Sequence, residues 1–113
     1  MNLIEGVAYV AHPYGGKVKN IKLSETIIEE IHKKYPCLIL LNPLGIFFYE
    51  KYSEDADKYI MQIEDCLSVL DICKCLIMTG EWEKSRGCLC EFGYAKGKGI
   101  QIFEWYGGEL HEM

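Results

Sequence analysis

The sequence predicts an α/β protein in which a parallel sheet lies between two layers of helices. Short apolar runs of strand length alternate along the chain with segments whose apolar residues recur at helical spacing. The runs carry too few polar residues for either face of the sheet to meet water, which is typical of parallel sheets covered on both faces. With 113 residues, 50% of them hydrophobic, the chain is expected to form a single domain over residues 1–113.

The first predicted strand and helix occupy the N-terminal third of the chain. An apolar run at residues 7–11 leads into the turn sequence HPYGG at residues 12–16. Between residues 20 and 35, apolar residues recur every three or four positions with charged residues between them, which predicts an amphipathic helix. Pro36 ends this helix, because a proline disfavours helical backbone in the residue before it.

The middle of the chain contains two further strands and a second helix. The apolar run at residues 37–41 predicts a strand, and Asn42-Pro43 predicts a turn after it. Residues 44–57 are rich in aromatic side chains without a clear period, so we expect a loop or short irregular helix whose aromatics could cover a pocket. A helix at residues 56–71 and a strand at residues 75–78 follow.

The last predicted helix begins at a residue suited to capping it. Ser85 stands at the N-cap position of a helix over residues 86–98, which Gly99 ends. A fourth strand is expected at residues 100–105, and a loose tail at residues 107–113. This order of elements predicts a flavodoxin-like (Rossmann-like) three-layer sandwich with four or five parallel strands and right-handed connections.

The carboxyl edge of this sheet is the expected ligand site, because ligands of open parallel sheets bind outside the carboxyl ends of the strands. Three predicted loops gather at that edge, at residues 12–16, 42–48 and 79–87. A small molecule bound there would contact side chains from distant parts of the chain.

Charge and hydropathy exclude several classes of partner. The chain has 12 Lys and Arg against 17 Asp and Glu, and no run of basic residues, so we expect no nucleic-acid polymer as a partner. No apolar stretch approaches the roughly 20 residues needed to cross a bilayer, so we expect no membrane association. The first residues lack the basic and apolar regions of a secretion signal, and we expect a cytoplasmic protein.

The six cysteines pose a separate question. A reducing cytoplasm disfavours a disulfide scaffold. The pairs Cys73/Cys75 and Cys88/Cys90 suggest zinc, but residues two apart on a helix point about 200° away from each other, so Cys88 and Cys90 cannot hold one ion. We therefore expect no metal site.

Single cysteines have different expected environments. Cys37 and Cys75 are expected in core strands, and Cys66 beside the core face of its helix. Cys88 lies near a helix N-terminus beside Arg86, which predicts a lowered pKa and a reactive thiol.

The segment that begins at Ser85 carries the strongest chemical pattern. Free N–H groups at a helix N-terminus bind anions, to which Ser85 adds a hydroxyl and Arg86 a positive charge, while Gly87 allows close approach to the backbone. Glu91 lies further along the helix, where its carboxylate could attack the anomeric carbon of a bound sugar or stabilise a cation formed there. The alternative is an ordinary capped helix with a surface glutamate, which spacing alone favours.

The same segment resembles a known family. The pattern Ser-x-Gly-x-x-x-Glu-x-Gly-x-Ala is matched by Ser85, Gly87, Glu91, Gly93 and Ala95. With it the chain resembles the nucleoside 2-deoxyribosyltransferase-like superfamily, which also includes the 2′-deoxynucleoside 5′-monophosphate N-glycosidases. The resemblance implies that Glu91 is the nucleophile and that Ser85 contacts a 5′-phosphate.

Two further segments extend the resemblance to residues 5–104. Residues 9–17 look like the family's tyrosine-bearing strand and its base- and phosphate-binding turn. Residues 80–88, with the sequence GEWEKSRGC, are similar to small prokaryotic and phage members. The substrate-binding residues expected from these segments are Tyr9, His12, Pro13, Tyr14, Gly15, Gly16, Trp82, Ser85, Arg86 and Gly87.

One position departs from the family pattern. The family places an Asp on the preceding helix, and an ungapped alignment of the third strands puts Cys66 there. Asp65 is adjacent but turned about 100° away, and Glu64 lies two positions off. An acid from residues 50–57 could substitute for it.

Several aromatic and histidine side chains allow two roles. His12 could act as a general base or only as a hydrogen-bonding or stacking group, and the second use is favoured. Tyr14, Trp82 and the pair Phe47/Phe48 could stack on a nucleobase or belong to the core.

The resemblance implies cleavage or transfer at an N-glycosidic bond. Glu91 would attack C1′ of a nucleoside or nucleotide, the base would leave, and water or a second base would release the sugar. No cofactor is expected, and superfamily members imply a homodimer or higher homo-oligomer. The alternative is a non-catalytic protein that senses or sequesters a nucleotide, and a weaker third class is a thiol redox or metal protein.

Overall fold

The computed structural model describes residues 5–15, 17–46 and 56–113. Its five-stranded sheet has the order β2-β1-β3-β4-β5. The strands are β1 (Gly6–Ala11), β2 (Leu38–Leu41), β3 (Cys75–Met78), β4 (Gln101–Tyr106) and β5 (Glu109–Glu112). The helices are α1 (Val18–Lys34), α2 (Pro43–Ile46), α3 (Ala56–Leu70), the 3₁₀ helix η1 (Trp82–Lys84) and α4 (Arg86–Lys98).

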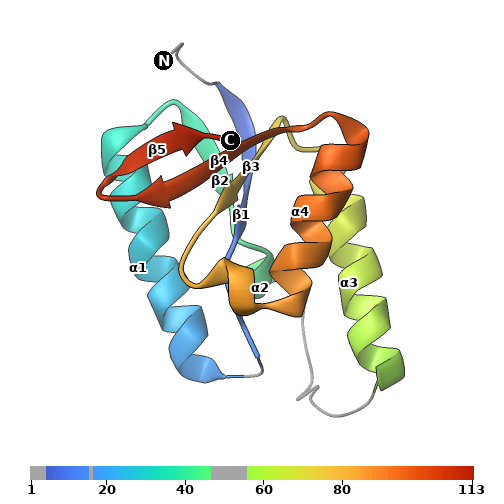
Figure 1. The fold of residues 1–113 in the computed structure, drawn as a ribbon. Helices are drawn as coiled ribbons and strands as arrows, with labels where there is room; N and C mark the ends of the chain where they lie inside the picture. Colours follow the sequence, from blue (N-terminus) through green and yellow to red (C-terminus); the bar gives the residue numbers. More distant parts are fainter. Residues whose placement is uncertain (1–4, 16, 47–55) are drawn as a thin grey trace.

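The predicted three-layer α/β architecture is confirmed. β1 pairs in parallel with β2 and β3, β3 pairs in parallel with β4, and only the last pairing described, β4 with β5, is antiparallel. Helix α1 lies on one side of the sheet and α3 and α4 lie together on the other (Figure 1). The strand order reverses between β1 and β3, which in this class of sheet is where ligands bind.

The core has two parts, one on each face of the sheet. Because side chains alternate along a strand, Leu76 and Met78 of β3 pack on the face of α3 and α4, whereas Cys75 and Ile77 pack toward α1. All four residues of β3 are buried. The continuous apolar run of this strand therefore identifies a strand with no exposed face, as predicted.

Helix α4 begins and ends as its sequence predicts. The Ser85 hydroxyl accepts a hydrogen bond from the Cys88 backbone N–H at 3.3 Å. Gly99 ends the helix in the left-handed conformation, with φ 75°. Glycine adopts this conformation most easily because it has no side chain. The N-terminus of α4 is thereby fixed at the carboxyl edge of the sheet.

Two expectations about chain segments are wrong. Residues 107–113 do not form a loose tail but contain β5, which a tight turn at Gly107 and Gly108 brings back against β4. Both glycines have positive φ, 61° and 74°, as two-residue hairpin turns of the favoured type require. Cys37 is exposed in the turn before β2 and is not in a core strand, because the strand begins one residue later.

Other cysteine placements agree with expectation. Cys75 is buried in β3, and Cys66 is half-buried on α3.

No helix in the described ranges is long and apolar enough to cross a membrane.

Strand β5 should contribute measurably to stability. Leu110 is 5% exposed and packs in the α1-side core, so Leu110→Ala should lower the free energy of unfolding by about 2–5 kcal/mol. The neighbouring Glu109 forms only an exposed ion pair with Lys34, and Glu109→Ala should cost at most about 1 kcal/mol. Urea denaturation checks both values, and equal effects would contradict the packing of β5.

Candidate functional site

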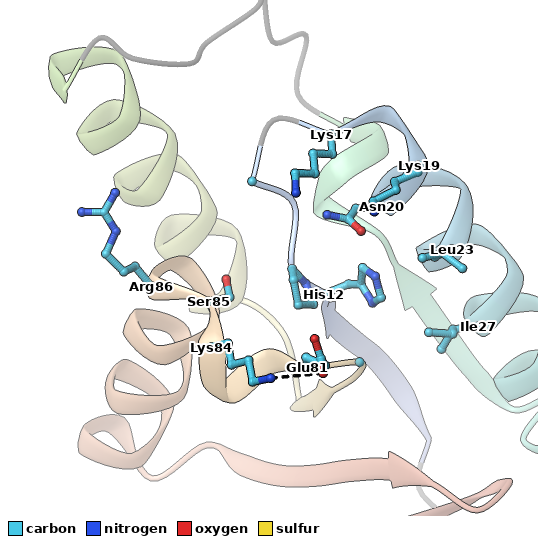
Figure 2. Close-up of a pocket in the computed structure, with 13 residues that line it drawn as sticks. His12, Lys17, Lys19, Asn20, Leu23, Ile27, Glu81, Lys84, Ser85 and Arg86 are labelled. Carbon is cyan, nitrogen blue, oxygen red and sulfur yellow. Dashed lines mark hydrogen bonds and ion pairs between the residues drawn. The ribbon is translucent and has the colours of Figure 1, made fainter.

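A cavity of about 620 Å³ opens at the carboxyl edge of the sheet (Figure 2). Its walls come from the turn after β1, one face of the first half of α1, and residues 80–86. We call it the α1-side cavity. Of the residues predicted to bind substrate, five line it, namely His12, Pro13, Gly15, Ser85 and Arg86.

His12 is held in one protonation state at the floor of this cavity. Thr79 Oγ1 donates its only hydrogen to the Ala11 carbonyl at 2.7 Å, so it can only accept from His12 Nδ1, which lies 2.9 Å away. Burial lowers the pKa of His12, which favours the neutral ring. His12 therefore carries its proton on Nδ1 and presents Nε2 as an acceptor.

Gly80 makes room for the His12 ring. It adopts a positive φ of 64°, and a Cβ at this position would lie 2.8 Å from His12 Cε1 and 3.1 Å from Nδ1. The space beside His12 therefore depends on a residue without a side chain. Neither Thr79 nor Gly80 carries a sequence pattern that predicts this role, although both directly follow the third strand.

Basic side chains surround the cavity. Lys17 and Lys19 come from the start of α1, and Lys84 and Arg86 come from the segment before and at the start of α4. Glu81, the acidic residue on the same wall, lies 3.4 Å from the Lys84 ammonium. The lining is thus cationic in a chain of net charge −5, and such a site favours an anionic ligand.

The candidate nucleophile lies on the other face of the sheet. Glu91 is 8% exposed, and the Tyr9 hydroxyl donates a hydrogen bond to its Oε2. Burial raises the pKa of Glu91 to about 7, and the hydrogen bond from Tyr9 works in the opposite direction. Tyr9 and Glu91, predicted to share a site, are brought into direct contact.

Tyr9 remains a proton donor in this environment. Burial raises its pKa far above the usual value, and the charges of Glu91 and Cys66 add to this rise. A hydroxyl that keeps its proton can stabilise the ionised form of the neighbouring carboxyl.

Cys66 lies beside the same hydroxyl. Its side chain hydrogen-bonds with Tyr9, so the position where the sequence departs from the pattern of the family that it resembles lies beside the Tyr9–Glu91 pair. Asp65 is exposed, in agreement with its predicted rotation away from the apolar face, and Glu64 is exposed as well. Another acid could come from residues 50–57, whose side chains lie outside the described part of the chain, as do Gly16, Phe47 and Phe48.

Trp82 occupies the core instead of an open stacking position. Its ring stacks on Phe92 at 5.2 Å between centroids, and its Nε1 donates to the Glu104 carboxylate at 2.9 Å. Trp82 is buried on the α3/α4 face. The structure thus gives this indole a packing role beneath the start of α4.

The remaining predicted residues shape the turns. The Tyr14 carbonyl accepts a hydrogen bond from the Asn20 side chain at 2.8 Å, which holds the turn after β1 against α1. Gly87 is half-buried in the first turn of α4. Asn20 also lines the α1-side cavity.

The expectation of a reactive Cys88 is wrong. Burial raises its pKa to about 12, and the charge of Glu91 adds to the rise, whereas the contact with Ser85 lowers it only partly. The effect of desolvation on the Cys88 pKa is here larger than any lowering by the helix N-terminus.

Within the described residues, no group of three or more His, Cys, Asp or Glu side chains could hold a metal ion.

Gly80 should tolerate a side chain less well than Gly15. Both have positive φ, which costs an alanine about 1–2 kcal/mol, but only at Gly80 would the new Cβ collide with the ring of His12. Gly80→Ala should therefore lower the free energy of unfolding more than Gly15→Ala and shift the NMR signals of the His12 ring. Equal losses of stability would show that the close contact is absent.

Glu91 should make stability depend on pH. Its pKa of about 7 lies above the usual value of 4.5, so the native state keeps a proton that the unfolded chain loses between these pH values. The free energy of unfolding of the wild type should fall as pH rises through this window. Glu91→Gln has no carboxyl to ionise, so its free energy of unfolding should rise relative to that of the wild type by on the order of 3 kcal/mol. Urea denaturation from pH 4 to 8 measures the difference.

The control for this experiment is Glu83→Gln. Glu83 is exposed in η1, and its substitution should change stability by no more than about 0.5 kcal/mol at any pH. A constant difference between wild type and Glu91→Gln across the range would contradict the burial of this carboxyl.

Comparison with solved structures identifies a related fold. A crystal structure of a conserved protein from Enterococcus faecalis V583 is 20% identical and superposes with a TM-score of 0.69. The match covers 91% of this chain and 64% of that chain, so this chain spans less than two thirds of that protein's length. At this identity the likeness supports the fold alone.

The sequence itself matches one family over most of its length. No curated protein matches the chain. Residues 7–104, from β1 to β4, match the domain of unknown function DUF4406. The matched range includes Tyr9, His12, Ser85 and Glu91. The chain therefore belongs to the DUF4406 family.

Proposed function

We propose that this protein cleaves or transfers the N-glycosidic bond of a nucleoside 5′-phosphate, with Glu91 as the nucleophile. The observation that carries the proposal is the buried Glu91 carboxyl, held by the Tyr9 hydroxyl and with a pKa of about 7. A carboxyl with no chemical role is seldom kept in such a position, because its ionised form is costly to bury. The resemblance to the nucleoside 2-deoxyribosyltransferase-like superfamily points to the same residue.

The chemistry follows from the two forms of Glu91. In its ionised form, a carboxylate oxygen attacks C1′, a bond to the sugar forms, and the C1′–N bond breaks with its electron pair on the base, which takes a proton from solvent. Water then attacks C1′ and restores the carboxylate, or a second base does so in a transfer reaction. Tyr9 orients the attacking carboxylate and favours its ionised form.

The start of α4 supplies the phosphate contact in this proposal. Ser85 and Arg86 lie at the helix N-terminus, where N–H groups and a guanidinium favour an anion. Residues 85 and 91 are separated by about 9 Å along the helix axis, a distance that the sugar of a nucleotide would bridge. Phosphate and C1′ would thus contact opposite ends of one helical segment.

A second candidate function is binding without turnover. The observation that favours it is Cys66, because the family that the chain resembles uses a second carboxylate where this chain has a thiol in contact with Tyr9. A protein of this kind would sense or sequester the nucleotide.

Release of free base distinguishes the two functions. Wild-type protein incubated with a panel of ribo- and deoxyribonucleoside 5′-monophosphates should release base, measured by liquid chromatography. Glu91→Gln should lose at least about 100-fold in rate, because the amide oxygen is a poor nucleophile, while Glu83→Gln retains the wild-type rate. Binding of a nucleotide without release by the wild type would favour the second function, and release that survives in Glu91→Gln would exclude Glu91 as nucleophile.

The pH profile of the same reaction tests the part played by Tyr9. The wild-type rate should rise as pH increases through about 7, because only the ionised carboxyl attacks. Tyr9→Phe removes the hydrogen bond that lowers the Glu91 pKa, so the rising limb should move to higher pH. An unchanged limb would show that Glu91 does not control the rate.

A further inference from the structure

The α1-side cavity is larger than a single phosphate at Ser85 requires. Its volume of about 620 Å³ lies within the range of pockets that enclose a whole small molecule. Glu91 and Tyr9 contact each other on the opposite face of the sheet and do not line it. Ser85 lies on its wall and also caps the helix that carries Glu91, so the two regions adjoin at this residue.

The polar groups of the cavity favour two different chemical groups on a ligand, an anion and a hydrogen-bond donor. The basic side chains, Lys17 and Lys84 among them, favour a phosphate. His12 favours a hydrogen-bond donor on the ligand. Its Nδ1–H donates a hydrogen bond to Thr79 Oγ1, so the unprotonated Nε2 can only accept one. The His12 side chain is 9% exposed, and no partner for Nε2 occurs among the described residues. A phosphate without a proton cannot satisfy Nε2, whereas a sugar hydroxyl can.

The cavity also has an apolar wall. Leu23 and Ile27 lie one turn apart on α1 and face it, with Leu23 52% exposed (Figure 2). Such a surface suits the carbon face of a sugar ring. Phosphate, hydroxyl and apolar contacts together describe a sugar phosphate.

We propose that the α1-side cavity is a second sugar-phosphate subsite, so that the substrate is a pyrophosphate-linked nucleotide with a sugar on each side of the linkage. The placement of the nucleotide half of this substrate beside Glu91 rests on the proposed function. The distal phosphate lies between Lys17 and Lys84, and the distal sugar donates a hydroxyl to His12 Nε2. The pyrophosphate passes Ser85, where the two regions adjoin.

The decisive probe is ribose 5-phosphate, which has no base and no bond that Glu91 could cleave. Calorimetry on wild-type protein and on Glu91→Gln should give the same affinity for ribose 5-phosphate, at least about tenfold tighter than for sulfate, an oxyanion with no proton to donate to Nε2. His12→Asn keeps a donor for Thr79 but loses the Nε2 acceptor, and it should remove this preference. Affinity for sulfate should change little in His12→Asn.

Charge variants test the phosphate half of the subsite. Lys17→Gln and Lys84→Gln should each weaken binding of ribose 5-phosphate several-fold, whereas Lys34→Gln, at the far end of α1 outside the cavity, should not. ADP-ribose should bind Glu91→Gln at least about tenfold more tightly than AMP, and His12→Asn should abolish the difference.

The outcomes separate this proposal from the proposed function. Equal affinity for ribose 5-phosphate and sulfate, or a preference that survives in His12→Asn, would overturn the second subsite whatever the base-release assay finds. Binding of ribose 5-phosphate with the expected dependence on His12, in a protein that releases no base, would retain the subsite and reject only the catalytic role of Glu91.

Discussion

The burial of one carboxyl against one hydroxyl constrains the rest of this structure. Glu91 on α4 and Tyr9 on β1 are 82 positions apart in the sequence, and their hydrogen bond joins β1 to the helix that begins at the carboxyl edge of the sheet. A buried carboxyl needs such a partner because water no longer solvates it. The packing that buries Glu91 also raises the pKa of Glu91, keeps Tyr9 protonated and makes Cys88 inert. One desolvated region thus sets the protonation of three side chains, Tyr9, Cys88 and Glu91.

Strand β1 serves both faces of the sheet. Tyr9 points toward α3 and α4, while His12, just past the end of the strand, lies at the floor of the α1-side cavity. Thr79, just past the end of β3, fixes the His12 ring and ties the ends of the two strands together through the Ala11 carbonyl. These two strands flank the point where the strand order reverses, and the geometry of parallel pairing brings their carboxyl ends side by side. The arrangement of this edge is therefore set by the neighbouring ends of the two strands.

Charge is distributed unevenly over this acidic chain. The net charge of −5 describes the whole sequence, yet the cavity gathers Lys17, Lys19, Lys84 and Arg86 from two segments. In a concave site, like charges reinforce one another's field, so a small anion meets a potential that the average composition does not reveal. The cysteines also have unequal environments: burial raises the pKa of Cys73, Cys75 and Cys88, whereas Cys37 and Cys90 are exposed.

Local sequence patterns predicted the order of β1 to β4 and of the long helices between them, the cap at Ser85, the end of α4 at Gly99 and the spacing from Ser85 to Glu91, because periodicity, capping and helix geometry are local properties. The sequence also aligned Cys66 with a position beside the site. Tertiary structure alone decided that residues 109–112 pair with β4, that Trp82 packs beneath α4, that His12 presents Nε2, and that the Glu91 pKa rises while Cys88 loses its reactivity. These properties depend on desolvation and on hydrogen-bond partners brought together from distant parts of the chain, which no local pattern records.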